Sequence, residues 1–228
     1  MKLLKNEWLQ LLILAAPFCA VALLWDKIPA RIPIHWNIHG QVDGYAGKTF
    51  GTLFMPVLNI FIAALLAVIP FLDPKIKKYD DETKANSVRV IKNLRLVVTL
   101  FNACFAFAIL AFALHYRFDM NRFAFGALGL LFILMGNFMG KLRPNYFAGI
   151  RTPWTLESKT VWLKTHRLGG RVMVAGGICM LFASFLLPAQ GSFLLLVLPF
   201  TLVIVLIPTI YSYVCYRAEK NTPGSTAA

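Results

Sequence analysis

Long apolar segments that carry no charged side chain constrain this chain more than any other feature. Hydrophobic residues make up 58% of its 228 residues and charged residues only 14%, against about 25% charged in an average soluble domain. A membrane-spanning helix needs about 20 mostly apolar residues. Because the runs are continuously apolar and do not alternate with polar positions, they predict helices and not a β-barrel. The charge-free runs are Trp8–Trp25, Thr49–Leu72, Leu96–Tyr116, Phe123–Gly140 and Val172–Tyr216.

The last of these runs is too long for a single span. It contains the sequence LPAQGS, Leu187–Ser192, whose Pro, Gln, Gly and Ser predict a hairpin turn between two helices. We therefore expect an all-α, polytopic membrane protein with six transmembrane helices. Lys2 and Lys5 precede the first run as in a signal peptide, but the run continues past any plausible cleavage site, so a retained helix is expected.

The distribution of Lys and Arg predicts the orientation. Segments on one side of the predicted helices hold 18 of the 23 basic residues and those on the other side hold 5. The positive-inside rule then puts both the N and C termini in the cytoplasm, with the protein in the inner (cytoplasmic) membrane. Topology and anionic membrane lipids account for the net charge of +13, so direct binding of nucleic acid is not expected. Four cysteines lie within or at the ends of spans and are interpreted as small buried hydrophobic residues: Cys19, Cys104, Cys179 and Cys215.

The predicted outer loop after the first helix gathers His35, Asn37, His39 and Asp43. Two histidines four residues apart would face one ligand on a helix, and with Asp43 they form a candidate divalent metal site at His35, His39 and Asp43. Prolines before the motif argue against a regular helix there. The alternative is a structural one, in which these groups and Asn37 hydrogen-bond to one another and cap the loop backbone, and apart from this metal no cofactor is expected.

The predicted inner loop Lys75–Arg95 mixes both signs of charge. From about Asp80 its composition is helical, which predicts that the third span extends into the cytoplasm. Its charges are interpreted as a solvated face, with a partner-docking surface as the alternative.

A second inner segment, Lys141–Arg171, combines seven basic residues with a single acid, Glu157. Its Pro and Gly content predicts a compact loop, followed from Ser158 by an amphipathic helix at the membrane interface that leads into the fifth span. Positive-inside anchoring would explain the helix alone. Arg143 and Arg151, held in a stiff aromatic turn, suit bidentate contacts to a carboxylate or a phosphate. The candidate ligand- or partner-binding residues are Arg143, Asn145, Tyr146, Arg151, Thr152, Trp154, Trp162, His166 and Arg167, and the candidate structural residues are Pro144, Pro153, Gly136 and Gly140, with Asn137 expected to face a neighbouring helix.

Two stretches resemble the SdpI family of multi-pass bacterial immunity proteins. GNFMGKLRPNYFAGIRTPWTLESKTVWLKTHRLGGRV (Gly136–Val172) is similar to the signature of that family, and IPIHWNIHGQVDGYAGK (Ile32–Lys48) resembles the N-terminal domain of unknown function often joined to it. The resemblance implies protection from a secreted, membrane-active peptide toxin and recruitment of a cytoplasmic repressor. It implies no catalytic residues. On this basis we divide the chain into an N-terminal helix pair (1–92), an SdpI-like four-helix region (93–220) and a tail (221–228).

Three function classes remain open, of which the first is the one that the resemblance implies. The first is a non-enzymatic immunity and signalling protein, with no catalytic residues. The second is a membrane-embedded enzyme, either metal-dependent at the outer loop or acting on lipid phosphate at the arginine loop; the two clusters fall on opposite sides and show no nucleophile–base spacing. The third is a small-solute transporter, in which intramembrane amides would line a path at Asn59, Asn102 and Asn137.

Overall fold

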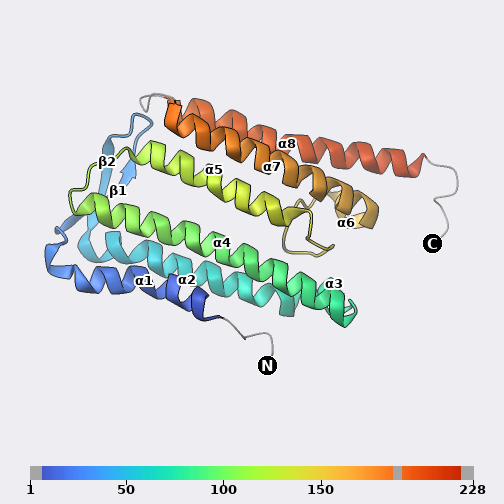
Figure 1. Cartoon of the computed structure of the whole chain (residues 1–228), viewed down its shortest axis with the longest axis horizontal. Helices are drawn as coiled ribbons and strands as arrows, with labels where there is room; N and C mark the ends of the chain where they lie inside the picture. The colour runs from blue at the N-terminus through green and yellow to red at the C-terminus, as the bar shows by residue number, and fades with distance from the viewer. Residues whose placement is uncertain (1–6, 187–191, 222–228) are drawn as a thin grey trace.

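The apolar runs form helices that lie side by side along one common direction (Figure 1). The computed structural model describes residues 7–186 and 192–221. The predicted turn at 187–192 falls almost entirely outside these residues, as does the predicted tail from 222 onward. The long helices are α1 (Trp8–Leu23), α2 (Lys48–Leu72), α4 (Asp81–Ala113), α5 (Met120–Met139), α7 (Lys159–Leu186) and α8 (Ser192–Lys220), and the short ones are η2 (Trp25–Lys27), α3 (Pro74–Lys77) and α6 (Pro153–Glu157).

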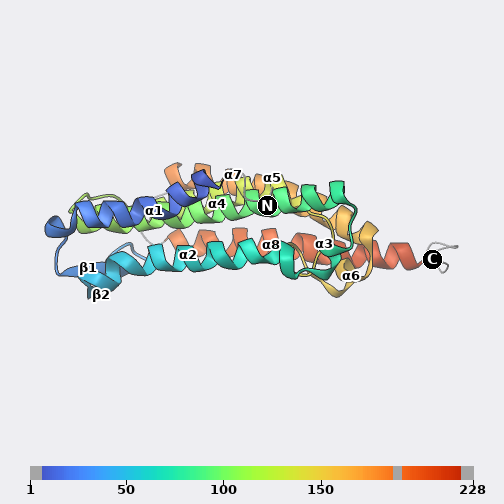
Figure 2. The same cartoon turned by 90° about the horizontal axis from the view of Figure 1, so that it is seen from below.

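The long helices form two layers. Figure 2 shows α1, α4, α5 and α7 in one layer and α2 and α8 in the other. By length and composition, five helices in the described part of the chain can cross a membrane: α2, α4, α5, α7 and α8. The sixth apolar helix, α1, has only 16 residues. The protein is thus a multi-pass helical membrane protein.

The prediction of an all-α protein needs one correction, because the outer loop is a β-hairpin. Strands β1 (Arg31–Trp36) and β2 (Val42–Gly47) pair antiparallel, with Ile32 opposite Ala46 and Trp36 opposite Val42. Pro29 and Pro33 keep the backbone extended, and the fully buried Ile32 side chain packs against Gly51 of α2. Burial of Ile32 anchors the hairpin on the ends of the helices.

The prediction of a separate amphipathic helix along the membrane interface also needs correction. Lys159–Leu186 is a single continuous helix, α7, which runs antiparallel to α5 (Figure 1). The two helices approach closely at paired glycines: a Cβ on Gly136 would lie 2.7 Å from the carbonyl oxygen of Gly170. Because this packing continues from the apolar part into the basic part of α7, the helix does not bend to lie along the interface.

Two buried amides inside the helical layers bond to a neighbouring helix, α4. Asn59 of α2 donates to the carbonyl oxygen of Thr99 at 3.0 Å, and Gln10 of α1 donates to the Thr99 hydroxyl at 2.9 Å. Asn102 donates within its own helix, to Val98. Asn137 is exposed, which contradicts its predicted position facing a partner helix. The amides proposed for a transport path are thus divided: Asn59 and Asn102 are buried and bonded to α4, whereas Asn137 lies on the exposed face of α5.

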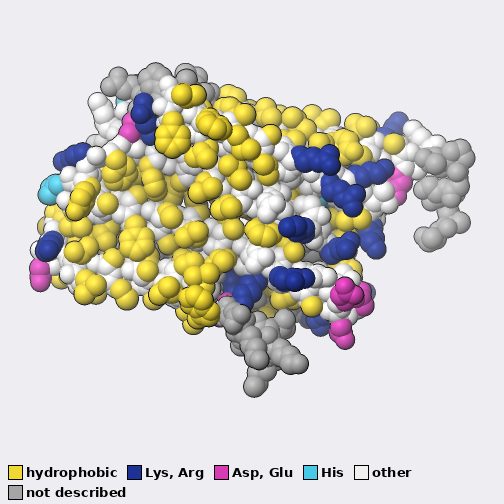
Figure 3. Space-filling model, in the orientation of Figure 1, with side chains coloured by type: hydrophobic (Ala, Val, Ile, Leu, Met, Phe, Trp, Pro, Cys, Tyr) yellow, Lys and Arg dark blue, Asp and Glu magenta, His cyan; other side chains and the backbone are white. Residues whose placement is uncertain are grey.

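The two ends of the bundle differ. The β-hairpin lies at one end, while α3, α6 and the C-terminal end of α8 lie at the other (Figure 1). In Figure 3 hydrophobic side chains cover the middle of the visible face, and many of the Lys and Arg side chains gather toward the end with α3 and α6. Segments that the charge bias assigned to one side therefore lie together in space.

Candidate functional site

The basic loop, residues 141–158 between α5 and α7, is built around Asn145. This residue is 1% exposed. Its Oδ1 accepts hydrogen bonds from the backbone N–H groups of Phe147 (2.9 Å) and Ala148 (2.6 Å), and its Nδ2 donates to the carbonyl oxygens of Arg143 and Ala148. Asn145 thus closes a tight turn from inside, and its side chain is not available to a ligand.

Trp162 and His166, both fully buried on α7, hold the start and the middle of this loop. Trp162 Nε1 donates to the carbonyl oxygen of Leu142 at 2.9 Å, and His166 Nε2 accepts from the backbone N–H of Ile150 at 3.0 Å. The two rings stack with centroids 4.0 Å apart. Since Nδ1 lies 2.8 Å from the carbonyl oxygen of Trp162, the neutral imidazole with its proton on Nδ1 satisfies both contacts.

Gly149 is required where the loop passes His166. Its φ is +109°, in the region that favours glycine, and a Cβ there would collide with the imidazole ring. The close approach of backbone to ring therefore depends on a residue without a side chain.

A capping box starts the short helix α6. The Oγ1 of Thr152 accepts a hydrogen bond from the backbone N–H of Thr155, and the Oγ1 of Thr155 accepts one from the backbone N–H of Thr152. The Thr155 hydroxyl also donates to the carbonyl oxygen of Ile150. The Thr152 hydroxyl also lies 3.0 Å from that of Ser212 on α8. Pro153 occupies the first helical position, where a missing N–H costs nothing. The predicted binding residue Thr152 is therefore a structural one.

Asp73, which the sequence analysis did not single out, joins the basic loop to the other half of the chain. Its carboxylate is fully buried: Oδ1 caps α3 through Lys75 N and Ile76 N, and Oδ2 accepts from the backbone N–H of Tyr146 at 2.6 Å. The Asp-Pro pair before a short charged segment was a readable helix-capping signal. Nothing in the sequence pointed to its second partner, 73 residues away.

Tyr79 makes a second connection to the loop. Its hydroxyl donates to the carbonyl oxygen of Pro144 at 2.7 Å. Burial of the ring raises the pKa of Tyr79 above its ordinary value of 10.0, the nearby Asp73 charge raises it further, and Arg143 acts in the opposite direction. Pro144 is buried at this contact, as a structural role requires.

The arginines of the candidate site lie on the surface of this rigid loop and of the adjoining part of α7. Arg143, Arg151 and Arg167 are exposed, and within the described residues none of them forms a salt bridge to an acidic side chain. Tyr146 is 39% exposed and lies beneath the ammonium of Lys75, while Trp154 packs on Tyr213 of α8 at 5.0 Å. The structure thus separates the predicted set into buried supports and outward-facing guanidinium groups.

At the other end of the molecule, only two of the three predicted metal ligands, His35 and Asp43, are brought together. His35 Nδ1 lies 2.5 Å from Asp43 Oδ1 across the hairpin, with both side chains largely exposed. His39 lies in the turn, where its backbone N–H bonds to Asn37 Oδ1. No group of three or more His, Cys, Asp or Glu side chains able to hold a metal occurs in the part of the chain that the structure describes. Residues four apart, such as His35 and His39, lie next to each other on one face of a helix. This segment is a β-hairpin, so the two histidine side chains do not meet.

Fold and site define a multi-pass helical membrane protein whose basic loop is tied down by buried hydrogen bonds. The resemblance to the SdpI family is confirmed: residues 141–212 match the SdpI/YfhL protein family, and residues 12–60 match a domain of unknown function, DUF1648. It is similar to the Immunity protein SdpI of Bacillus subtilis (strain 168), with 24% identity over 215 residues that cover 94% of this chain and 97% of the relative. No solved structure matches the chain.

Proposed function

We propose that this protein is a non-enzymatic immunity protein of the cytoplasmic membrane, which protects its cell from a membrane-active peptide toxin. A relative named as an immunity protein aligns over almost the full length of both chains, which supports this assignment. The observation that carries it is the use of the polar residues in the basic loop and in the start of α7 that packs against it. Asn145, Thr155 and His166 are engaged with backbone groups, while Arg143 and Arg151 face outward as binding groups.

The topology that fits this role has six spans and both termini in the cytoplasm. The charge bias supports this orientation, since 18 of the 23 basic residues belong to the segments assigned to the cytoplasm. In this arrangement α1 is the sixth span, and η2 continues the chain toward the outer surface. The hairpin then faces outward, where a secreted peptide arrives, and the basic loop faces the cytoplasm.

The two ends of the molecule therefore have different partners. The hairpin and the outer part of the membrane face meet the toxin, whereas the basic loop meets a cytoplasmic regulator such as a repressor. Arg143 and Arg151 project from a loop that Asn145 and Pro144 hold rigid. A guanidinium presented in this way engages a carboxylate through two parallel hydrogen bonds, which a lysine ammonium does not reproduce.

A challenge of sensitive cells with a panel of membrane-active peptides tests this function. Cells that express the protein are expected to survive at least one peptide that kills cells without it. Arg151→Lys keeps the charge and is expected to lose most protection or signalling, while Lys159→Ala serves as the matched control and retains both. Absence of protection against every peptide contradicts the immunity role. Wild-type behaviour of Arg151→Lys, with loss of function in Lys159→Ala, contradicts the role of the loop.

A further inference from the structure

A hollow of about 490 Å³ lies between α5 and α7 at the point where both helices pass from apolar to charged sequence. Its volume is in the range of sites that hold a small molecule. In α5 the charge-free run ends at Gly140 and Lys141 follows, and in α7 the run begins at Val172, directly after Arg171. The hollow therefore lies at the depth where a bilayer changes from acyl chains to headgroups.

The floor of the hollow exists because glycines bring the two helices together. Gly136 and Gly170 touch backbone to backbone, so no side chain fills the space above them. Toward the apolar part of the bundle the walls are Val174, Ala175 and Ile178. Ala175 and Ile178 are exposed, which leaves an apolar channel open to the side.

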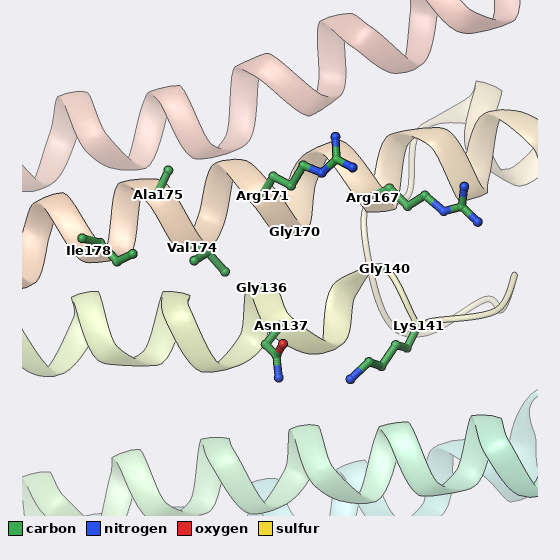
Figure 4. A pocket seen from close by; sticks show the side chains of 10 residues that line it. All are labelled: Gly136, Asn137, Gly140, Lys141, Arg167, Gly170, Arg171, Val174, Ala175 and Ile178. Carbon is green, nitrogen blue, oxygen red and sulfur yellow. The ribbon is translucent and has the colours of Figure 1, made fainter.

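The other end of the hollow is strongly basic. Lys141, Arg167 and Arg171 line it, all three are exposed, and no acidic side chain pairs with them among residues 7–186 and 192–221. Figure 4 shows Lys141 pointing toward Asn137, while Arg167 and Arg171 extend in the opposite direction, toward the basic loop. Three positive charges within one hollow attract an anion.

Asn137 gives a second indication of a ligand. Its side chain lies on the exposed face of α5 at the rim of the hollow and makes no hydrogen bond within the described residues. A polar group facing lipid without a partner is unfavourable, because hydrocarbon offers it no hydrogen bond. An amide at this depth is matched by the phosphate and ester oxygens of a phospholipid.

We propose that this hollow binds an anionic phospholipid, whose phosphate lies among Lys141, Arg167 and Arg171 and whose acyl chain follows Val174, Ala175 and Ile178. Asn137 donates to the ester region between these two parts. The proposal does not depend on the immunity function, since it concerns how the protein meets its own membrane. A soluble phosphate would share the charge recognition but would leave the apolar channel unused.

Native mass spectrometry of the full-length protein in detergent tests this proposal. The probes are dioleoyl phosphatidylglycerol, dioleoyl phosphatidylcholine and glycerol phosphate. We expect phosphatidylglycerol to bind at least tenfold more tightly than phosphatidylcholine, with an affinity that falls as salt rises. Glycerol phosphate is expected not to compete at equal concentration, and effective competition by it would identify a soluble anion site and overturn the proposal.

Variants separate this site from general attraction by positive charge. The triple variant Lys141→Gln, Arg167→Gln, Arg171→Gln should weaken phosphatidylglycerol binding at least tenfold. The control triple variant is Lys77→Gln, Lys78→Gln, Arg89→Gln. It removes the same amount of charge from exposed positions of α3 and the start of α4, at the same end of the bundle, and should bind the lipid as the wild type does. Ala175→Phe fills the channel without a charge change and should weaken binding too. Equal loss in the control, or wild-type binding by Ala175→Phe, contradicts the proposal.

Discussion

The carboxylate of Asp73 accepts a 2.6 Å hydrogen bond from the backbone N–H of Tyr146. Asp73 lies between α2 and α3, and Tyr146 lies in the basic loop. The bond therefore joins two segments that are 73 residues apart in the sequence. The carboxylate is fully buried, and within the described residues it accepts hydrogen bonds from three backbone N–H groups. The N-terminal and C-terminal parts of the chain therefore depend on each other at this point.

Asp73→Asn is expected to destabilise the protein by about 1–3 kcal/mol, the usual cost of leaving a buried polar group unsatisfied. An asparagine still caps α3 through its oxygen, but its NH₂ group then faces the N–H of Tyr146, donor against donor. Thermal unfolding in detergent measures the loss, and limited proteolysis of the basic loop should become faster.

Asp80→Asn is the matched control. Asp80 caps α4 through Thr83 N on the exposed surface, where asparagine is an equally good cap. Its variant should unfold like the wild type. Equal stability of the Asp73→Asn and Asp80→Asn proteins would show that the Asp73–Tyr146 bond does not join the two parts.

Gly136 of α5 and Gly140, which caps the C-terminal end of α5, should differ sharply in their tolerance of a methyl group. At Gly136 a Cβ would lie 2.7 Å from the carbonyl oxygen of Gly170 and 2.9 Å from Met173 Cβ, whereas at Gly140 the nearest atoms are 3.7 Å away. Gly136→Ala is therefore expected to separate the helices and cost about 1–3 kcal/mol, as overpacking does. Gly140→Ala should be neutral or slightly stabilising, since alanine is the better helix former.

Folded yield in detergent and thermal stability distinguish these two glycine variants. Of the two glycines paired in the sequence, Gly136 makes a close backbone contact with α7 and Gly140 makes only an ordinary van der Waals contact. If both variants behave alike, α5 and α7 do not pack through Gly136.

Tyr79→Phe should remove a hydrogen bond to Pro144 and destabilise the protein by about 0.5–1.5 kcal/mol near neutral pH. Because the folded-state pKa of Tyr79 is raised by burial and by Asp73, the unfolded chain loses this proton first as the pH rises. The stability difference between wild type and Tyr79→Phe is thus fully present below pH 10 and shrinks as the pH rises through the folded-state pKa.

Unfolding of both proteins across an alkaline pH series measures this difference. Tyr116→Phe, at an exposed position, is the control and should match the wild type throughout. A difference between wild type and Tyr79→Phe that stays constant at high pH would contradict the assigned ionisation.

Reporter fusions test the proposed topology. Fusions after Arg95 and Lys164 should report a cytoplasmic location, and fusions near Asp43 and Asp119 an external one, because of the bias in Lys and Arg. In the structure Asp43 lies in β2 and Asp119 caps α5, both at the hairpin end of the bundle (Figure 1). An inverted pattern of signals would contradict the orientation, and a cytoplasmic signal near Asp43 would remove α1 as a span.

The helical architecture could be predicted from the sequence to a large extent. Charge-free runs such as Thr49–Leu72 coincide with α2 nearly residue for residue, because a bilayer excludes unpaired backbone polar groups. The extension of the third span from about Asp80 is confirmed by α4, which begins at Asp81. The close approach at Gly136 is confirmed as well. These features depend on local composition, which a sequence states directly.

The outer loop was predicted less well. A helical spacing between His35 and His39 suggested shared ligands, but the segment pairs as β1 and β2, and only His35 and Asp43 meet. Burial of Ile32 against α2 decides this arrangement. A short segment with several prolines takes its conformation from the surface on which it packs, and this surface is assembled from distant helices.

The sequence by itself determined that this chain crosses a membrane in helices and presents a stiff, basic loop between α5 and α7. Tertiary structure alone decided which residues of that loop face outward. Asn145, Thr152 and His166 are buried because backbone groups of the loop, Ser212 of α8 and the ring of Trp162 surround them, while Arg143 and Arg151 are exposed. A buried polar side chain is stable only with a partner, and that partner often lies far away in the chain, as Asp73 does from Tyr146.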